Sequence, residues 1–320
     1  MPYVVGHRGA AGVQPENTIE GFEYAIGLGC EYVETDVHLC ADGHLVIIHD
    51  DTVDRTTNGS GRVDEMTLAQ LRGLDAGQGR RIPLLQEVLD VVRGRAILLC
   101  ELKGPFTPDP VARAVMGNRM QEQVIFTSFH FGRLARIKQI DPRLQTGATF
   151  GDPPADALEE ALALGASTVG IHYPKMTEEF VVRARRLGLN LRAWNPDEEA
   201  DIQRMIDLGP TGISSNRPDR VMKLLGIGEQ RASISIGKSD KEITTMASLY
   251  SQLIQMSGQN CKTISQDKEA KMEADESGVQ ITYPTGNRLF IPREVVEKGI
   301  SRLVQQGSID VDEVHHPLCL

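Results

Sequence analysis

The chain has 320 residues, of which 40% are hydrophobic and 24% charged, and its formal net charge is -10. This is the composition of a globular protein with room for two domains, and its acidity argues against general binding to nucleic acid or to anionic membranes. No apolar run approaches the ~20 residues of a membrane-spanning helix, so stable membrane insertion is not expected. The 5 cysteines form no C-x-x-C pair, which favours a reducing, cytoplasmic location.

Short β-type runs alternate with amphipathic segments over about the first 225 residues. Strands are predicted at 3–6, 32–37, 45–49, 96–102, 124–127, 144–148, 168–171, 190–193 and 212–214. Helices predicted between them, from apolar residues three or four positions apart, include 18–28, 85–93, 131–140, 156–164, 177–187 and 198–208. Strands that alternate with helices are typical of parallel sheets, and about eight such units match an α/β protein of the (β/α)8 TIM-barrel class.

Two segments depart from this alternation. Residues 51–81 are rich in Thr, Asn and Gly and predict a small inserted subdomain with one helix near 68–71. Beyond residue 228 the pattern predicts helices at 242–256 and 292–306, the second beginning at Pro292, and strands at 262–265, 270–274, 279–283 and 288–291. We therefore expect a barrel domain over 1–228 and a small α+β module over 229–320, through which the chain would form a homo-oligomer or bind a partner.

Acidic, basic and imidazole side chains gather where the first four predicted strands end: His7, Arg8, Glu34, Asp36, His49, Glu101 and Lys103. Residues i and i+2 of a strand share a face, so Glu34 points with Asp36, and Glu101 points with Lys103. In a TIM barrel the carboxyl ends of the strands surround the active site. Three carboxylates that converge there need a cation or protons between them, and oxygen ligands favour Mg²⁺ or Ca²⁺ over zinc.

The remaining charged groups suit a phosphate ester. The two histidines can exchange protons near neutral pH, and Arg8 and Lys103 add fixed positive charge. With a metal ion, these groups would neutralise a phosphate and move protons to and from the ester oxygens. No GxxxxGK[ST] or GxGxxG run is present, so no nucleotide-binding loop is predicted.

As an ordered set, these residues resemble the glycerophosphodiester phosphodiesterase family. The resemblance covers about residues 3–225 and is carried by His7-Arg8-Gly9, Pro15-Glu16-Asn17-Thr18, Glu34-Thr35-Asp36, His49-Asp50, Asp54-Arg55-Thr56 and Glu101-Leu102-Lys103. It implies a barrel enzyme that cleaves glycerophosphodiesters to glycerol 3-phosphate and an alcohol. It also implies metal ligation by three carboxylates, acid–base catalysis by two histidines and phosphate contacts from two cations: Glu34, Asp36, Glu101; His7, His49; Arg8, Lys103.

The sequence leaves the roles of some site residues open. Asn17 either shapes the substrate site or caps the helix that follows it, and Trp194 is either a pocket wall or a core aromatic; we count both as substrate-binding candidates. The sequence does not decide which histidine is the acid, or whether water or a substrate hydroxyl attacks. The family's usual Trp-Thr-Val-Asn run reads Trp194-Asn195-Pro196-Asp197 here, and its usual Asp before Arg-Pro reads Asn216, which bears on substrate preference.

Two other functions are compatible with these residues. One is a phosphodiesterase that acts on lysophospholipid-type diesters. The other is a diester-binding sensor that signals through the C-terminal module, although the complete set of histidines and carboxylates argues for catalysis.

Overall fold

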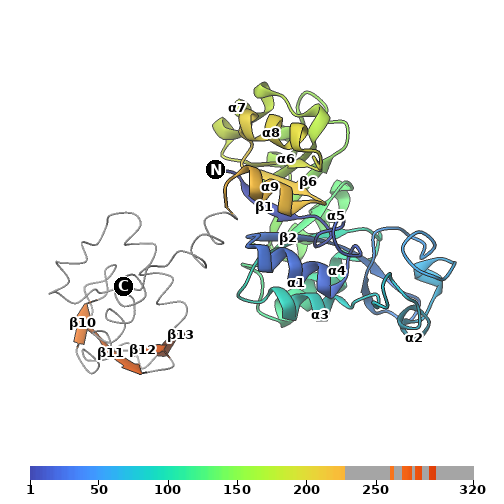
Figure 1. Ribbon diagram of the computed structural model, residues 1–320, viewed down its shortest axis with the longest axis horizontal. Coiled ribbons are helices and arrows are strands. Elements are labelled where there is room, and N and C mark those ends of the chain that lie inside the picture. The colour runs from blue at the N-terminus through green and yellow to red at the C-terminus, as the bar shows by residue number, and fades with distance from the viewer. Residues whose placement is uncertain (228–259, 263–268, 276–277, 283–287, 293–320) are drawn as a thin grey trace. The chain divides into compact units, whose positions relative to one another are not determined.

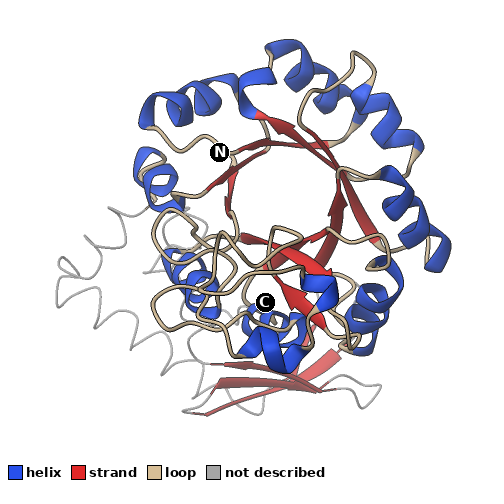
Figure 2. Cartoon of the chain, turned by 90° about the vertical axis from the view of Figure 1, so that its right-hand side faces the viewer, coloured by secondary structure: helices blue, strands red, loops and turns tan. Residues whose placement is uncertain are grey.

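The computed structural model describes residues 1–227 and four strands of the C-terminal region, 260–262, 269–275, 278–282 and 288–292. The chain divides into two compact units, Met1–Gln230 and Arg231–Leu320. In the first unit, parallel strands pair in the order β1-β9-β8-β7-β6-β5-β4-β2, and β2 returns to β1 to close a barrel with helices outside it (Figure 2). The predicted TIM-barrel fold is confirmed.

The barrel strands and helices alternate along the chain as predicted. The strands are β1 (Tyr3–Gly6), β2 (Tyr32–Leu39), β4 (Ile97–Leu102), β5 (Val124–Ser128), β6 (Gln145–Phe150), β7 (Thr168–His172), β8 (Asn190–Trp194) and β9 (Gly212–Ser215). The helices are α1 (Ile19–Leu28), α3 (Leu85–Val92), α4 (Pro108–Gly117), α5 (Phe131–Ile140), α6 (Ala157–Ala163), α7 (Glu178–Leu187), α8 (Glu199–Leu208) and α9 (Pro218–Leu224). Local residues set their ends: the Thr18 hydroxyl accepts from the backbone N–H of Gly21 before α1, and left-handed Gly29 ends it.

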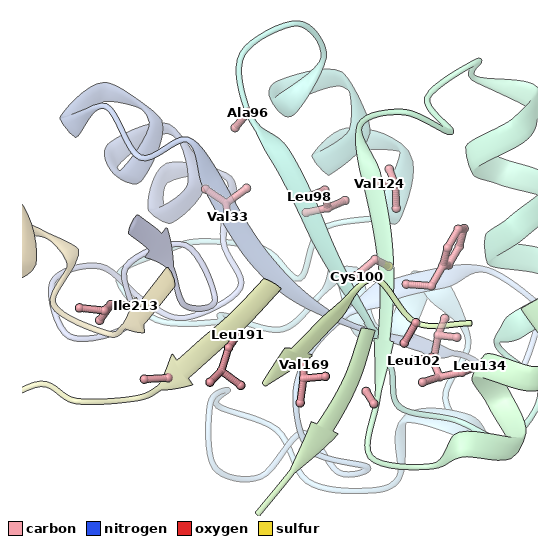
Figure 3. Packing of buried hydrophobic residues seen from close by; sticks show 14 of the residues in the cluster. Val33, Ala96, Leu98, Cys100, Leu102, Val124, Leu134, Val169, Leu191 and Ile213 are labelled. Atoms are coloured by element: carbon pink, nitrogen blue, oxygen red, sulfur yellow. The ribbon is translucent and has the colours of Figure 1, made fainter. Parts of the chain in front are cut away.

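The main apolar core lies between the strands and the surrounding helices. Alternate residues of β4 point to opposite faces, so Leu98, Cys100 and Leu102 lie in this layer, with Leu102 beside Leu134 of α5 (Figure 3). Cys100 is fully buried there. Glu101, between Cys100 and Leu102, therefore points into the barrel.

The inserted segment forms a small subdomain between β3 (Leu45–Ile47) and α3. β3 pairs antiparallel with β2, because no helix separates them, and so it extends the sheet without joining the barrel. The insertion carries a 3₁₀ turn, η1 (Val63–Glu65), and the predicted helix, α2 (Leu68–Arg72). Its own apolar cluster, which includes Val53, Val63 and Leu71, holds it together.

The described part of the C-terminal region is an antiparallel sheet in chain order, β10 (Asn260–Lys262), β11 (Glu269–Asp275), β12 (Gly278–Thr282) and β13 (Arg288–Pro292) (Figure 1). Pro292 was expected to begin a helix, but it is the last residue of β13 and pairs with Gly278. The predicted helix 242–256, and the predicted helix 292–306 beyond Pro292, lie outside the described residues. Among the described helices, none has the length and apolar character needed to cross a membrane.

Candidate active site

The carboxyl ends of the barrel strands surround a cavity of about 180 Å³. Most of the residues singled out in the sequence line it: His7, Arg8, Glu34, Asp36, His49, Glu101, Lys103 and Trp194. Four further residues complete the lining: Phe129, Thr149, Arg192 and Asn195. The barrel therefore brings the candidate histidines, carboxylates and cations to one place.

The turn after β1 has an uncommon backbone conformation. Arg8 and Gly9 have positive φ angles of 49° and 82°, and a left-handed non-glycine residue often marks a functional site. A Cβ atom on Gly9 would lie 2.6 Å from the backbone carbon of Gly21, so only glycine fits here. The turn directs the backbone N–H of Arg8 to Glu34, which accepts it through Oε2 at 3.0 Å.

Glu34, Asp36 and Glu101 form a buried acidic cluster whose ligand oxygens all lie within 4.8 Å of one another. Burial and the charges of Asp36 and Glu101 raise the pKa of Glu34 well above its usual value. Burial also raises the pKa of Glu101, although Lys103 opposes the change. Such crowding is favourable only when protons or a cation are shared. The three carboxylates are hard oxygen donors and could hold a divalent metal ion.

Two cations lie against this cluster. Lys103 Nζ is 2.7 Å from Glu101 Oε1 and 3.3 Å from Asp36 Oδ1. Arg8 Nε is 3.3 Å from Asp36 Oδ2, and Arg8 Nη1 donates to Glu16 Oε1 at 3.0 Å. Burial alone would raise the pKa of Asp36, but the charges of Lys103 and Arg8 outweigh burial and lower it. Asp36 is therefore ionised, with its charge compensated from two sides.

Asn17 lies behind Asp36 and does not line the cavity. Its Nδ2 donates to Asp36 Oδ2 at 2.9 Å, and its Oδ1 accepts from Thr35 Oγ1 at 3.1 Å. The α1 N-cap is Thr18 and not Asn17. The amide of Asn17 thus fixes the carboxylate of Asp36, which supports the site-shaping interpretation of Asn17 over the capping one.

A chain of hydrogen-bonded side chains fixes the ring of His7. Asn216 Nδ2 donates to Asp197 Oδ2 at 2.6 Å, so Asn216 Oδ1 faces His7 Nδ1, 2.7 Å away, as an acceptor. The proton of neutral His7 therefore sits on Nδ1, and Nε2 is left as an acceptor, 3.2 Å from Asn195 Nδ2. Burial, and then the charge of Arg8, lower the pKa of His7 to about 4, so the ring is neutral at pH 7.

His49 has a different partner. Its Nδ1 lies 2.6 Å from Asp50 Oδ1, and Arg55 holds that carboxylate through Nε at 2.7 Å while also donating to Glu16. Hydrogen bonds from Arg55 hold the pKa of Asp50 well below its usual range. His38 Nε2 donates to the backbone oxygen of His49 at 3.1 Å, which gives His38 a supporting position. With Nδ1 bound to a carboxylate, His49 can carry a proton on Nε2 with its charge compensated.

Trp194 forms an aromatic wall of the cavity. Its ring packs edge-on against Phe129, with centroids 5.5 Å apart, and lies 4.7 Å from the ring of His172. Within the described residues, the buried Nε1 of Trp194 has no hydrogen-bond partner, so it can donate to a bound molecule. Lys103 Nζ lies 5.8 Å from the centre of the Phe129 ring. The position of Trp194 on the cavity lining, beside Phe129 and His172, favours its interpretation as a pocket wall.

Sequence reasoning gave no role to several of these partners. Arg55 stands inside a motif that carries the family resemblance, and Asp197 and Asn216 stand where the chain departs from the family's usual residues, so these positions were the available signal. Arg192 and Thr149 carry no motif. The alternation of inward and outward residues along β8 and β6 could have placed them inside the barrel.

Known proteins resemble the barrel in sequence and in structure. The sequence model of the Glycerophosphoryl diester phosphodiesterase family matches residues 7–220. The chain belongs to this family. A glycerophosphodiester phosphodiesterase of Caldanaerobacter subterraneus subsp. tengcongensis is 35% identical over 238 residues, which are 70% of this chain and 98% of that protein.

Two solved structures of phosphodiesterases match the same part of the chain. The crystal structure of a glycerophosphodiester phosphodiesterase from Agrobacterium tumefaciens C58 is 31% identical, with a TM-score of 0.63 over 70% of this chain and 100% of that chain. A phosphodiesterase of Oleispira antarctica, solved with the product sn-glycerol-3-phosphate, is 28% identical, with a TM-score of 0.65 over 71% and 97% of the two chains. Membership of the glycerophosphoryl diester phosphodiesterase family confirms the predicted resemblance and shows that the chain is an enzyme of this class.

The contact between Asn216 and His7 predicts a selective kinetic effect. Asn216→Ala removes the acceptor at Nδ1, so the ring can turn or change tautomer, and we expect kcat to fall by up to about 10²-fold with a smaller change in KM. Asn216→Asp keeps an acceptor at Nδ1 and should retain more activity than Asn216→Ala. Its added charge should also raise the pKa of His7, so the acidic limb of kcat/KM should move to higher pH. Equal losses in the two variants, measured from pH–rate profiles, would contradict the assigned tautomer.

Proposed function

We propose that the chain hydrolyses glycerophosphodiesters to glycerol 3-phosphate and an alcohol, with a divalent metal at Glu34, Asp36 and Glu101. The observation that carries this proposal is the pair of histidines on one cavity with opposite partners. His7 presents an unprotonated Nε2 backed by a neutral amide, whereas His49 is backed by a carboxylate. Such a pair is suited to take one proton and give another in the same turnover.

In this mechanism His7 is the general base and His49 the general acid. His7 Nε2 takes the proton from the attacking hydroxyl as its oxygen bonds to phosphorus, the bond from phosphorus to the leaving alcohol breaks, and His49 Nε2 gives its proton to that alcohol. When the attacking hydroxyl is the substrate's own, water then opens the cyclic phosphate by a second P–O exchange to give glycerol 3-phosphate. Arg8 and Lys103 compensate negative charge on the phosphoryl group. A bound Mg²⁺ or Ca²⁺ would supply further charge neutralisation at a non-bridging phosphate oxygen.

The proposal places all of this chemistry in the barrel domain, residues 1–228, with 229–320 as a separate module. It also keeps the cytoplasm as the compartment. The described cysteines, Cys30, Cys40 and Cys100, are all free and buried, which supports a reducing environment.

Product analysis tests the proposed reaction directly. The full chain with Mg²⁺ or Ca²⁺ should convert glycerophosphocholine to glycerol 3-phosphate and choline, as followed by phosphorus NMR. A cyclic phosphate that appears before glycerol 3-phosphate would identify a substrate hydroxyl as the nucleophile, and its absence would favour water. A lysophospholipid, tested in parallel, separates the water-soluble from the lipid substrate class. Absence of turnover on every diester, with tight diester binding by calorimetry, would overturn the proposal in favour of a binding module.

A further inference from the structure

The interior of the barrel differs between its two sides. On the side of β1, β2, β4 and β5 it is filled by apolar and aromatic side chains: Val5, Leu99 and Ile125, with Tyr3, Tyr32 and Ile97 packed against them. On the side of β5 to β9 the buried side chains are small or polar: Thr127, Thr149, Thr168, Arg192 and Ser214. TIM-barrel interiors are ordinarily filled by bulky branched residues, so the polar side is unusual.

Arg192 is the charged residue of this polar side. It is 5% exposed and lines the catalytic cavity. Its strand neighbours in register are Gly170 of β7 and Gly212 of β9, and a Cβ on Gly170 would lie 2.9 Å from Arg192 Nη2. The absence of a side chain at Gly170 therefore makes room for the guanidinium group.

The guanidinium of Arg192 has no ion pair and no hydrogen bond within the part of the chain that the structure describes. By contrast, Arg8 and Lys103 in the same cavity are both paired with carboxylates. A buried charge without a partner is strongly unfavourable unless something binds it. The positive charge of Arg192 also acts on His7 and helps to lower the pKa of its imidazole.

Unpaired hydroxyl groups accompany this cation. Thr149 lines the same cavity and is 4% exposed, and its Oγ1 has no hydrogen-bond partner among the described residues. The same holds for the buried Oγ1 of Thr127 on the neighbouring strand β5. A forked cation with hydroxyl donors beside it is the arrangement that recognises an oxyanion.

We propose that Arg192, together with the hydroxyl of Thr149, is an oxyanion subsite at the floor of the catalytic cavity. Its ligand is a phosphate-type anion, carried by the substrate, by the phosphomonoester product or by inorganic phosphate. The link to substrate rests on the proposed function, whereas the subsite itself rests on the unpaired guanidinium. A doubly charged phosphomonoester gains more from this third cation than a singly charged diester does, so the product should compete with the substrate.

Calorimetric titration of the full chain with inorganic phosphate tests the subsite, both with Mg²⁺ and with a chelator. Arg192→Met keeps a long side chain without charge and should weaken phosphate binding by about 10- to 100-fold, because a hydrogen-bonded charge pair is lost. Arg192→Lys keeps the charge without the fork and should be intermediate. Arg185→Met is the matched control, because Arg185 is exposed on α7 and makes no ion pair within the described residues.

A second readout separates binding from folding. Without phosphate, Arg192→Met should melt at a higher temperature than the natural chain, because a buried unpaired charge is removed. Added phosphate should raise Tm in the natural chain and much less in the variant. Unchanged phosphate affinity and an unchanged Tm shift in Arg192→Met would overturn the inference.

The subsite and the proposed function can fail separately. If the natural chain hydrolyses no diester but still binds phosphate through Arg192, the proposed function fails and the subsite stands. Inhibition by glycerol 3-phosphate that depends on Arg192 supports both.

Discussion

Replacing Glu34 with Gln should greatly lower turnover, and it should make the metal-free protein more stable. Glu34 is buried beside two further carboxylates, so its charge is unfavourable without a cation. The neutral amide removes that repulsion but is a poor metal ligand. Loss of an outer partner of a metal ligand typically costs ~10–100-fold, so loss of the ligand should lower kcat/KM by more than about 100-fold. Mg²⁺ or Ca²⁺ should raise Tm in the natural chain and fail to do so in Glu34→Gln.

The raised pKa of Glu34 determines how stability and metal affinity should change with pH. The folded-state pKa of Glu34 lies above its unfolded value, so its contribution to stability is fully present below the unfolded pKa. That contribution is lost as the pH rises through the folded pKa. Metal binding requires the carboxylate and displaces its proton, so metal affinity should rise with pH over the same range. Thermal melts with chelator and with metal, repeated across pH, check both trends. Glu160→Gln is the control, because Glu160 is exposed on α6 and makes no ion pair within the described residues. An equal metal-induced shift in Glu34→Gln would exclude Glu34 as a ligand.

Removing either histidine should lower kcat by ~10²–10⁴-fold on natural diesters, because each moves a proton in the transition state. The two variants should differ on a glycerophosphodiester whose alcohol is a nitrophenol. That alcohol leaves without a proton, so His49→Ala should recover much of its activity. His7→Ala should not recover, because the nucleophile still needs a base. Steady-state kinetics on the two substrates measure the difference.

His44→Ala supplies the control for these variants, since His44 is exposed and does not line the cavity. Recovery of His7→Ala in place of His49→Ala would reverse the assigned roles. Near-normal turnover of glycerophosphocholine by His7→Ala would exclude His7 as a catalytic residue. The natural chain should also keep its activity well below pH 6.5 at saturating metal, because the base loses function only as pH falls towards its pKa of about 4.

Much of the barrel was predictable because its signals are local. Apolar spacing marks the helices, threonine and glycine mark the ends of α1 and α7, and alternation along β2 and β4 aims Glu34, Asp36 and Glu101 inward. The antiparallel direction of β3 is not a local signal, because strand direction depends on the connection and not on the strand's own residues. The choice between the two interpretations of Asn17 required the tertiary structure, because no local pattern specifies the buried carboxylate that its amide contacts.

By itself, then, the sequence determined the fold class and the inward-facing carboxylates, and it singled out the two histidines that we propose as catalytic, since these follow from periodicity and from motifs. Only the tertiary structure decided the tautomer of His7, the hydrogen-bond partner of His49 and the isolation of Arg192. Barrel closure pairs β1 with β9, which brings His7 to Asn216, a residue 209 positions away, and so sets its tautomer. The inserted segment brings Arg55 to Asp50 and Glu16. Hydrogen bonds and desolvation depend on which groups are close in space. Closure of the sheet brings these groups together and so sets the protonation and orientation of the site residues.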